Sequence, residues 1–302
     1  ECLSCTEGKG EGESHAPIIV GVSCMSTLTP SQLRLQCRDG RWTAPTSGAC
    51  LGYKQANMVI LPEDLAVDYR GFCERNSKAC PLLETVWQDG QVCEVARDAN
   101  LKTDLPRYRI YKDGALVEEV EDATPFFQPG MVGFLLGCSF SFELALMRAG
   151  ISVRNIDEGK NVSMYKTNIA CQCHGPFSTT MVVSMRPIPE ERIEEVVRIT
   201  SFFVDCHGAP VHIGDPSAIG ILNLGSPDFG DAVTVLPGEV PVFWACGVTA
   251  IVAAISAKPA ICITHAPGHM FITDVPEEEK EEGKADPTTQ CGIENAHQAS
   301  SQ

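Results

Sequence analysis

Residues 240–264 read VPVFWACGVTAIVAAISAKPAICIT, a stretch that is apolar over most of its length. A membrane-spanning helix needs about 20 consecutive apolar residues, and this stretch is long enough. Pro241, Gly247, Lys258 and Pro259 interrupt it, however, and such residues break regular elements. The pattern therefore predicts a strand over 240–245, a helix over 247–257 and a second strand over 259–264.

The same order of strand and helix occurs earlier in the chain. Residues 131–138 form an unbroken apolar run, which is typical of a buried strand. Ser139 follows as a candidate N-cap, and the pattern predicts a helix over 140–149 that Gly150 ends. Residues 189–203 have apolar side chains on one helical face and glutamates in the first turns, which predicts a further helix.

One segment predicts a hairpin, because residues 107–120 place two strand-like runs around Asp113–Gly114. Helices and strands that alternate, with hairpins among them, indicate the α/β class. We expect a mixed-sheet α/β sandwich with a smaller α+β subdomain inserted in the middle. Residues 31–120 and 221–275 would form the main α/β domain, and residues 121–220 the inserted subdomain. We expect a poorly ordered segment over 1–30 and a disordered acidic tail over 276–302.

Composition excludes several kinds of partner. The chain has 302 residues and a formal net charge of −16, which argues against nucleic acid and against an anionic membrane surface. It has 15 cysteines, several of them inside apolar runs, as at Cys138, Cys246 and Cys262. An odd number of mostly apolar-flanked cysteines favours free thiols in a reducing compartment. The composition also allows a homo-oligomer.

Residues 207–216, HGAPVHIGDP, hold two of the seven histidines. Together with His265 and His269, these histidines could form a metal site. Prolines separate the members of each pair, however, and neither pair has a standard zinc spacing. The cluster CQCH at 171–174 lacks a second cysteine pair and is a weaker candidate still. We expect no metal ion and no cofactor.

Three further segments carry polar or reactive side chains where strands end. The segment GCSFSFE, residues 137–143, puts Cys138, Ser139, Ser141 and Glu143 at a helix start, where backbone N–H groups bind carboxylates. The segment at 161–169 carries Asn161 and Tyr165, and Arg186 ends an apolar run as a candidate carboxylate ligand. Each of these features also occurs in ordinary structural roles, as a cap, a strand surface or a surface arginine.

Taken together, these segments resemble the D-glutamate cyclase family, which is also described as a hydro-lyase family. The resemblance rests on ordered motifs from about residue 48 to 274, among them VGFLLGCSFSFE at 132–143, GKNVSMYKTNI at 159–169, HGAPVHIGDPSAIGI at 207–221, GEVPVFWACGVT at 238–249 and ITHAPGHMFITD at 263–274. The chain departs from the family pattern at 202–206, which lacks an arginine, and at Ala250–Ile251. The resemblance is strongest to a vertebrate mitochondrial branch, which implies the mitochondrial matrix.

The resemblance implies conversion of D-glutamate to 5-oxo-D-proline and water, with the amino group attacking the γ-carboxyl carbon. This intramolecular attack needs no second substrate. We expect His207 and His212 to transfer protons, with Asp215 orienting an imidazole and Glu143 as a reserve acid.

The remaining candidate residues would bind the substrate. The helix start at Ser139–Ser141 would bind a carboxylate or the oxyanion, and Arg186 the other carboxylate, while Asn161 and Tyr165 would complete the pocket. Cys138 lines the same turn, and a thioester on it is a weaker alternative. Two other functions stay open: a metal-assisted hydro-lyase for another small carboxylic acid, and a non-catalytic small-molecule-binding domain.

Overall fold

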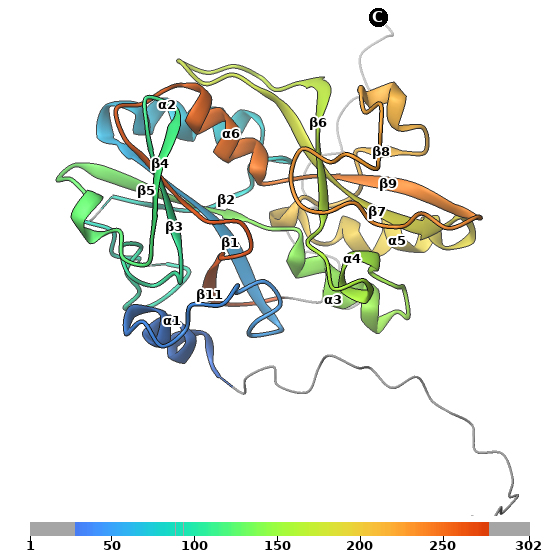
Figure 1. The fold of residues 1–302 in the computed structure, drawn as a ribbon, viewed down its shortest axis with the longest axis horizontal. Coiled ribbons are helices and arrows are strands. Elements are labelled where there is room, and N and C mark those ends of the chain that lie inside the picture. Colours follow the sequence, from blue (N-terminus) through green and yellow to red (C-terminus); the bar gives the residue numbers. More distant parts are fainter. Residues whose placement is uncertain (1–27, 88, 93, 278–302) are drawn as a thin grey trace, which may run out of the picture.

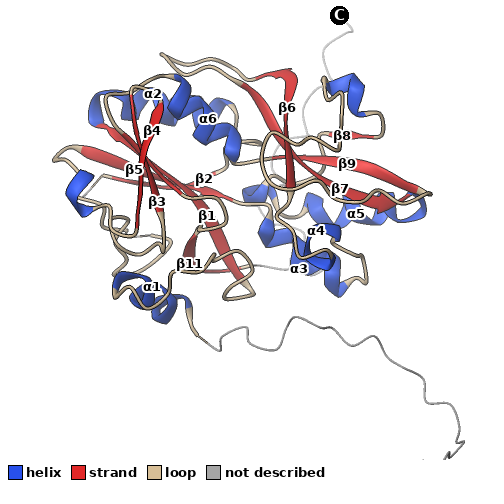
Figure 2. Ribbon diagram, viewed as in Figure 1, coloured by secondary structure: helices blue, strands red, loops and turns tan. Residues whose placement is uncertain are grey.

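The computed structural model describes residues 28–87, 89–92 and 94–277, which fold into two antiparallel sheets with helices beside each (Figures 1 and 2). The expected disordered tail lies, except for residues 276 and 277, outside the described residues, as do residues 1–27 of the expected N-terminal segment. Residues 28–30 are described, and Pro30 already begins a helix. The mixture of helices and strands agrees with the α/β class.

The larger sheet has seven strands, and its strand pairings among the described residues are antiparallel. Its strands are β1 (Tyr53–Pro62), β2 (Leu82–Val86), β3 (Tyr108–Lys112), β4 (Ala115–Val120), β5 (Met131–Gly137), β10 (Cys262–His265) and β11 (Phe271–Pro276). Their order is β2-β5-β1-β10-β3-β4, and β11 pairs with β1. The predicted hairpin is confirmed as β3–β4, with Asp113 and Gly114 at positive φ in its turn.

The smaller sheet has four strands in the order β6-β7-β9-β8, also antiparallel. They are β6 (Ser163–Ala170), β7 (Thr180–Pro189), β8 (His212–Ile213) and β9 (Glu239–Ala245). The expectation of a mixed sheet is therefore wrong. Connections that contain helices do occur, between β1 and β2 and between β7 and β8. In each case a later strand, β5 or β9, inserts antiparallel between the two parallel strands, so that they never pair.

Six α-helices lie within the described residues: α1 (Pro30–Arg38), α2 (Glu63–Arg75), α3 (Phe140–Arg148), α4 (Arg154–Asp157), α5 (Ile193–Ser201) and α6 (Val248–Ser256). Short 3-10 turns add η1 (Thr124–Phe126), η2 (Glu190–Arg192), η3 (Val204–Cys206) and η4 (Pro216–Ile219). The predicted strand, helix and strand over 240–264 are confirmed as β9, α6 and β10. No described helix is long and apolar enough to cross a membrane.

Both faces of the larger sheet are buried. Along β1, Val59 and Leu61 pack with α2 and α6, whereas Met58 and Ile60 pack with residues of the long segment between β2 and β3. Figure 1 shows α2 and α6 together above this sheet and α3 and α5 beneath the smaller one. Because successive strand residues face opposite sides, burial on both faces explains the nearly continuous apolar sequence of β1.

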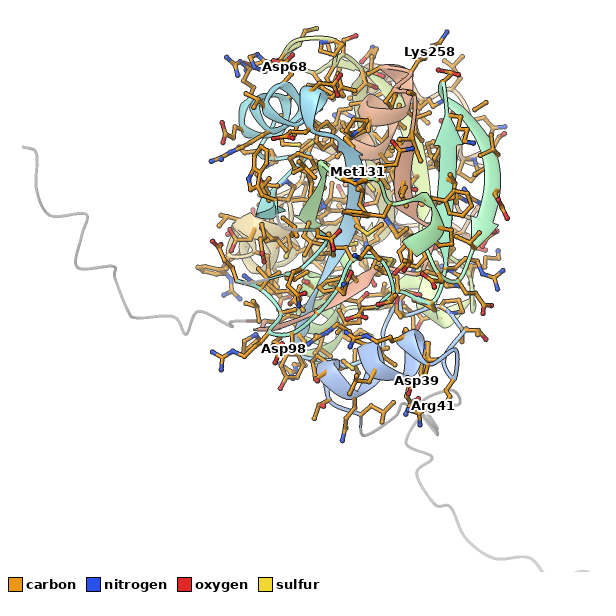
Figure 3. All side chains as sticks on the ribbon, turned by 90° about the vertical axis from the view of Figure 1, so that its left-hand side faces the viewer. Asp39, Arg41, Asp68, Asp98, Met131 and Lys258 are labelled. Carbon is orange, nitrogen blue, oxygen red and sulfur yellow. The ribbon has the colours of Figure 1, made fainter. Side chains whose placement is uncertain are left out.

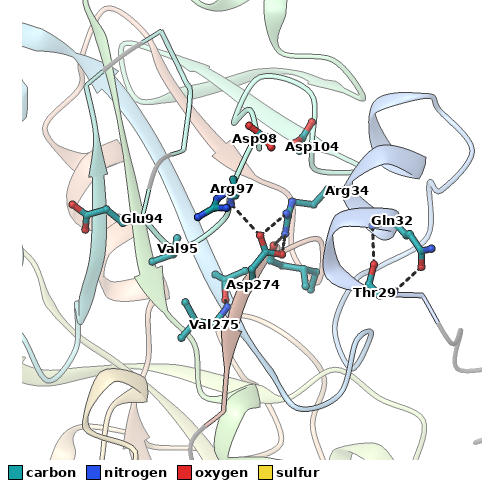
Figure 4. Close-up of polar contacts among 12 residues, drawn as sticks. Thr29, Gln32, Arg34, Glu94, Val95, Arg97, Asp98, Asp104, Asp274 and Val275 are labelled. Carbon is teal, nitrogen blue, oxygen red and sulfur yellow. Dashed lines mark hydrogen bonds and ion pairs between the residues drawn. The ribbon is translucent and has the colours of Figure 1, made fainter.

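Helix α1 is held at the edge of the larger sheet by a charged contact (Figure 4). Both terminal nitrogens of Arg34 donate to the carboxylate of Asp274 at 2.9 Å, and the backbone N–H of Arg97 donates to the same carboxylate at 3.0 Å. At the start of the helix, Thr29 and Gln32 form a reciprocal capping box. Figure 3 shows Asp39 and Arg41 at this end of the molecule and Lys258 at the opposite end.

The sheets do not follow the expected domain boundaries at residues 120/121 and 220/221. Strand β5 falls within the expected insert but lies in the larger sheet, and β9 falls within the expected main domain but lies in the smaller sheet. The ten cysteines among the described residues are all unpaired, and only Cys173 of these is exposed. This is consistent with the interpretation of the apolar-flanked cysteines as small buried side chains.

Candidate active site

Two strand-to-helix turns carry the chain from one sheet to the other. Strand β5 of the larger sheet leads through Cys138 into α3, which packs against Trp244 and Ile188 of the smaller sheet. Strand β9 of the smaller sheet leads through Cys246 into α6, whose Ala250 packs against the larger sheet. The two turns therefore meet where the sheets adjoin.

Glycines allow the close packing of both turns. A Cβ on Gly137 would overlap with the carbonyl oxygen of Asp205, and a Cβ on Gly247 would overlap with the side chain of Asn57. The same Asn57 donates from Nδ2 to the carbonyl oxygen of Gly137 at 3.1 Å. Asn57 therefore lies against both turns.

Two adjoining cavities lie at these turns. The smaller has a volume of about 220 Å³ and the larger about 460 Å³. Both are lined by Phe140, Asn161, Pro267 and Gly268, so that they share a wall. The two cavities differ in chemistry, because the smaller one is lined mostly by apolar side chains and the larger one includes several polar groups.

A buried ion pair forms part of the wall of the larger cavity. The guanidinium of Arg186 donates from Nε to Glu143 Oε1 at 3.0 Å, and a terminal nitrogen of Arg186 donates to the same oxygen. Ser139 and Ser184 accept the other guanidinium hydrogens. No described residue donates to Glu143 Oε2, and Glu143 lines the larger cavity. Burial raises the pKa of Glu143, although Arg186 opposes that shift.

Two amide oxygens in the same cavity wall have no hydrogen-bond donor. Gln55 donates from Nε2 to the carbonyl oxygens of Thr46 and Ala49, each at 3.2 Å, but its Oε1 is unpaired. Asn155 Oδ1 is likewise buried and unpaired within the described residues. A buried acceptor without a donor costs about 1–3 kcal/mol, so these two oxygens lower the stability of this part of the fold.

His265 lies in the wall of the smaller cavity. The backbone N–H of Met58 donates to its Nδ1 at 3.2 Å, a shorter contact than the 3.5 Å from Nδ1 to the carbonyl oxygen of Met58, which favours the tautomer with the proton on Nε2. Burial lowers the pKa of His265 to about 4, so that the ring is neutral at physiological pH. No described residue accepts a hydrogen bond from its Nε2–H.

Comparison with known proteins gives the family. A family model described as D-glutamate cyclase matches residues 132–274. The protein described as "Putative hydro-lyase YcsI" from Bacillus subtilis strain 168 is 54% identical over 252 residues, covering 83% of this chain and 98% of that protein. The chain belongs to the D-glutamate cyclase family. A second "Putative hydro-lyase", from Stutzerimonas stutzeri strain A1501, is 52% identical and covers 83% of this chain and 96% of that protein.

Among solved structures, the nitrogen repressor-like protein MJ0159 from Methanococcus jannaschii matches with a TM-score of 0.35 and 10% identity, over 78% of this chain and 91% of that chain. A likeness of this size carries no conclusion. The named relatives in the D-glutamate cyclase family are bacterial, so membership of a vertebrate mitochondrial branch stays a prediction.

The structure brings four of the predicted residues of this cyclase-family chain to the cavities. Cys138 and Ser139 line the smaller cavity, Glu143 the larger, and Asn161 both. Asn161 Oδ1 accepts from the N–H of Val162 at 2.9 Å, which leaves its NH₂ group for a ligand. Ser139 precedes α3 as predicted but does not cap it with its side chain, which instead accepts from Arg186.

Arg186 and Ser141 do not line either of these cavities. Arg186 is 1% exposed and its fork is committed to Glu143, which makes it a support of that carboxylate rather than a ligand of substrate. Ser141 lines a separate hollow of about 260 Å³, and its hydroxyl oxygen is buried without a partner within the described residues. Burial raises the pKa of the Cys138 thiol, which disfavours a thiolate nucleophile.

The histidines of the 207–216 segment lie elsewhere. His207 is buried, has a φ of 80°, and donates from Nδ1 to the carbonyl oxygen of Lys78 at 2.9 Å. Burial lowers its pKa to about 4, and its Nε2 has no partner within the described residues. His207 lines neither of the two cavities. Its contacts hold the loop that packs on Gly137.

His212 and Asp215 lie at the edge of the smaller sheet. His212 Nε2 contacts the carbonyl oxygen of Asp215 at 2.7 Å, and its ring lies 5.7 Å from the ring of Phe243. The carboxylate of Asp215 instead accepts from the N–H and hydroxyl of Ser217 and caps η4, which lowers its pKa. The expected carboxylate–imidazole contact is therefore absent from the described structure.

The other candidate groups are also apart from the cavities. Tyr165 donates from its hydroxyl to the carbonyl oxygen of Leu224 at 2.7 Å, within a separate apolar cluster. His269 contacts the carbonyl oxygen of Pro267 at 2.8 Å. No group of three or more His, Cys, Asp or Glu side chains among the described residues is arranged to hold a metal ion.

The sequence did not single out Gln55, Asn57 or Asn155 as site residues. It placed His265 behind His207 and His212 as a candidate for proton transfer. Gln55 and Asn57 lie within the segment GYKQANMVILPEDLAVDY, residues 52–69, in which only the apolar run 57–61 predicts a strand. Polar side chains inside a strand that is buried on both faces were the available signal, because buried polar groups need partners.

Proposed function

We propose that this chain cyclises D-glutamate to 5-oxo-D-proline and water in the paired cavities beside β5 and β9. The observation that carries the proposal is the carboxylate of Glu143 in the wall of the larger cavity, whose Oε1 is held by Arg186 and whose Oε2 has no donor among the described residues. An ionisable oxygen acceptor of this kind suits a substrate ammonium group. Family membership supplies the reaction class.

Glu143 is the group that would transfer protons. The substrate ammonium must lose a proton before it attacks, and the departing hydroxyl must gain one. Glu143 Oε1 is fixed by Arg186, which leaves Oε2 for the substrate. Because burial raises the pKa of Glu143, it is a stronger base than an exposed glutamate and can return the proton as an acid. We therefore favour Glu143 over His207 and His212 for this role.

The smaller cavity offers donors for the γ-carboxyl group. In the transition state the γ-carbonyl oxygen becomes an oxyanion, which the neutral Nε2–H of His265 would stabilise. The starts of α3 and α6 lie at the same cavity and add the positive ends of two helix dipoles. The NH₂ group of Asn161 in the shared wall would hold the α-carboxylate.

The test is incubation of the purified chain with D-glutamate and chiral detection of 5-oxoproline, with L-glutamate as the control. We expect 5-oxo-D-proline to form at a rate proportional to enzyme concentration. A folded chain that forms no product from D-glutamate would remove the proposal. A mitochondrial matrix location and a homo-oligomeric state stay predictions of the sequence, since none of the described residues bears on them.

A further inference from the structure

Helix α6 contributes apolar side chains to the lining of the smaller cavity. Its nine residues, VTAIVAAIS, contain no charged side chain. Thr249, Ala250, Ala253 and Ala254 are buried on one side of the helix. Val248, Ile251, Val252 and Ile255 are only partly buried, and all four line the smaller cavity. Their spacing of three, one and three residues places them on one face of the helix.

Other elements also contribute apolar side chains to the smaller cavity. They come from β3, the start of β6 and the loop before β9, and include Tyr111, Val162, Met164 and Phe229. The cavity is also lined by residues of the strands and turns described above, namely Asn57, Cys138, Ser139 and His265. The cavity thus has a polar end next to the candidate reaction centre and an apolar remainder along α6.

Free glutamate leaves the apolar remainder unexplained. Its γ-carboxyl group ends in two oxygens and has no carbon beyond them, so it has nothing to place along α6. The cavity volume of about 220 Å³ is below the roughly 300–1,000 Å³ of pockets that take drug-sized ligands. A substituent of a few heavy atoms on the γ-carbonyl carbon matches this size.

We propose that the smaller cavity binds a short apolar substituent on the γ-carbonyl, so that γ-D-glutamyl alkylamides are also substrates. This inference rests on the proposed function, because it uses the same attack by the substrate amino group. The bond from the amino nitrogen to the γ-carbon forms, and the bond from that carbon to the amide nitrogen breaks. One proton passes from the attacking amine to the departing alkylamine through Glu143. The products are 5-oxo-D-proline and the alkylamine.

The polar groups near the apolar remainder do not favour a charged substituent. Arg109 lines the cavity, but it is paired with Glu119, with Arg109 Nε donating to Glu119 Oε1 at 2.7 Å. A substituent that ends in an ammonium group would lose its hydration among the apolar side chains of α6 and would find no free anionic partner in Arg109. An alkyl chain has no such hydration to lose.

The experiment compares kcat/KM of the wild-type chain for two isosteric amides. One is γ-D-glutamyl-n-propylamide, and the other is γ-D-glutamyl-2-aminoethylamide, in which an ammonium group replaces the terminal methyl. We expect kcat/KM to be at least about tenfold higher for the propylamide, the size of effect that one group in an apolar pocket produces. The release of 5-oxo-D-proline and of amine are both measured, with free D-glutamate as a third substrate.

Variants of α6 test whether the preference for the propylamide arises at this helix. Ile255→Trp fills the cavity at the last turn of the helix and is expected to remove the preference for the propylamide, measured as the ratio of kcat/KM for the two amides. The matched control is Ser256→Trp, which adds the same ring at an exposed position on the same turn. Val252→Phe serves as a second filling variant if thermal unfolding shows that Ile255→Trp does not fold.

The outcomes separate this inference from the proposed function. Turnover of D-glutamate with no turnover of the propylamide, or equal kcat/KM for the two amides, overturns the inference and leaves the cyclase function standing. Turnover of the propylamide without turnover of D-glutamate supports the inference and removes D-glutamate as the substrate. A folded chain that acts on none of the three substrates removes both.

Discussion

The two strand-to-helix turns of this protein share a plan and differ in chemistry. Each leaves a strand of one sheet, passes through a buried cysteine and enters a helix that packs on the other sheet. Helix α3 carries Glu143 in its first turn, paired with Arg186 of β7. Helix α6 has no charged residue. The turn at α3 therefore provides ionisable groups, and the turn at α6 provides shape and apolar surface.

The largest expected effect follows from removing the ionisable group at the start of α3. Glu143→Gln should lower kcat by about 10²–10⁴-fold, the usual contribution of a general acid–base group. Because the basic form of Glu143 is the carboxylate, and its pKa is raised above 4.5, the wild-type activity should fall with decreasing pH at a point above 4.5. Steady-state kinetics over a pH series measure both effects.

The control for this variant is Glu74→Gln, which removes an exposed carboxylate from an ion pair with Arg70 on α2. It should change kcat little. Turnover of Glu143→Gln close to that of wild type would assign the proton transfer to another group.

Removing the partner of Glu143 tests whether Arg186 supports the carboxylate. Arg186→Met leaves a buried carboxylate without its cation and should lower the free energy of unfolding by about 3–5 kcal/mol. The double variant Glu143→Gln/Arg186→Met removes both charges and should regain part of that loss, while still lacking activity. Denaturant unfolding measures the stability of each. A double variant that is no more stable than Arg186→Met would show that the two residues are not coupled.

A smaller effect distinguishes the backbone geometry of the two turns. Gly137→Ala would place a methyl group against the carbonyl oxygen of Asp205, and backbone cannot move aside easily, so a loss of about 1–3 kcal/mol is expected. Gly247→Ala meets the side chain of Asn57, which can rotate. We expect it to cost less stability but to disturb activity through Asn57. Equal losses of stability in the two variants would contradict this difference.

The smallest expected effect concerns the edge of the smaller sheet. His212 and Asp215 line neither cavity, so His212→Ala and Asp215→Asn should leave kcat within about twofold, as for ordinary surface substitutions. A loss of turnover of two orders of magnitude would restore the role that the sequence suggests for His212. His207→Ala is the contrasting variant, because it removes the buried contact with Lys78 and should lower stability.

Much of the secondary structure could be predicted because the signals are local. The hairpin at Asp113–Gly114, the helix that follows Ser139 and the elements of residues 240–264 each depend on neighbours within a few positions. The pairing of strands could not be predicted in this way. Whether β5 inserts between β1 and β2 depends on contacts across many residues of sequence. The expectation of a mixed sheet was wrong for this reason.

The sequence by itself determined the family and the cysteine-containing turn that precedes Glu143, since these depend on ordered motifs. Only the tertiary structure decided which polar residues share a cavity. It placed Gln55, Asn155 and Glu143 around one cavity, committed Arg186 to that glutamate, and separated His207 and His212 from the cavities. Residue types along the chain do not reveal such neighbours, because the cavities form only when segments from both sheets pack together.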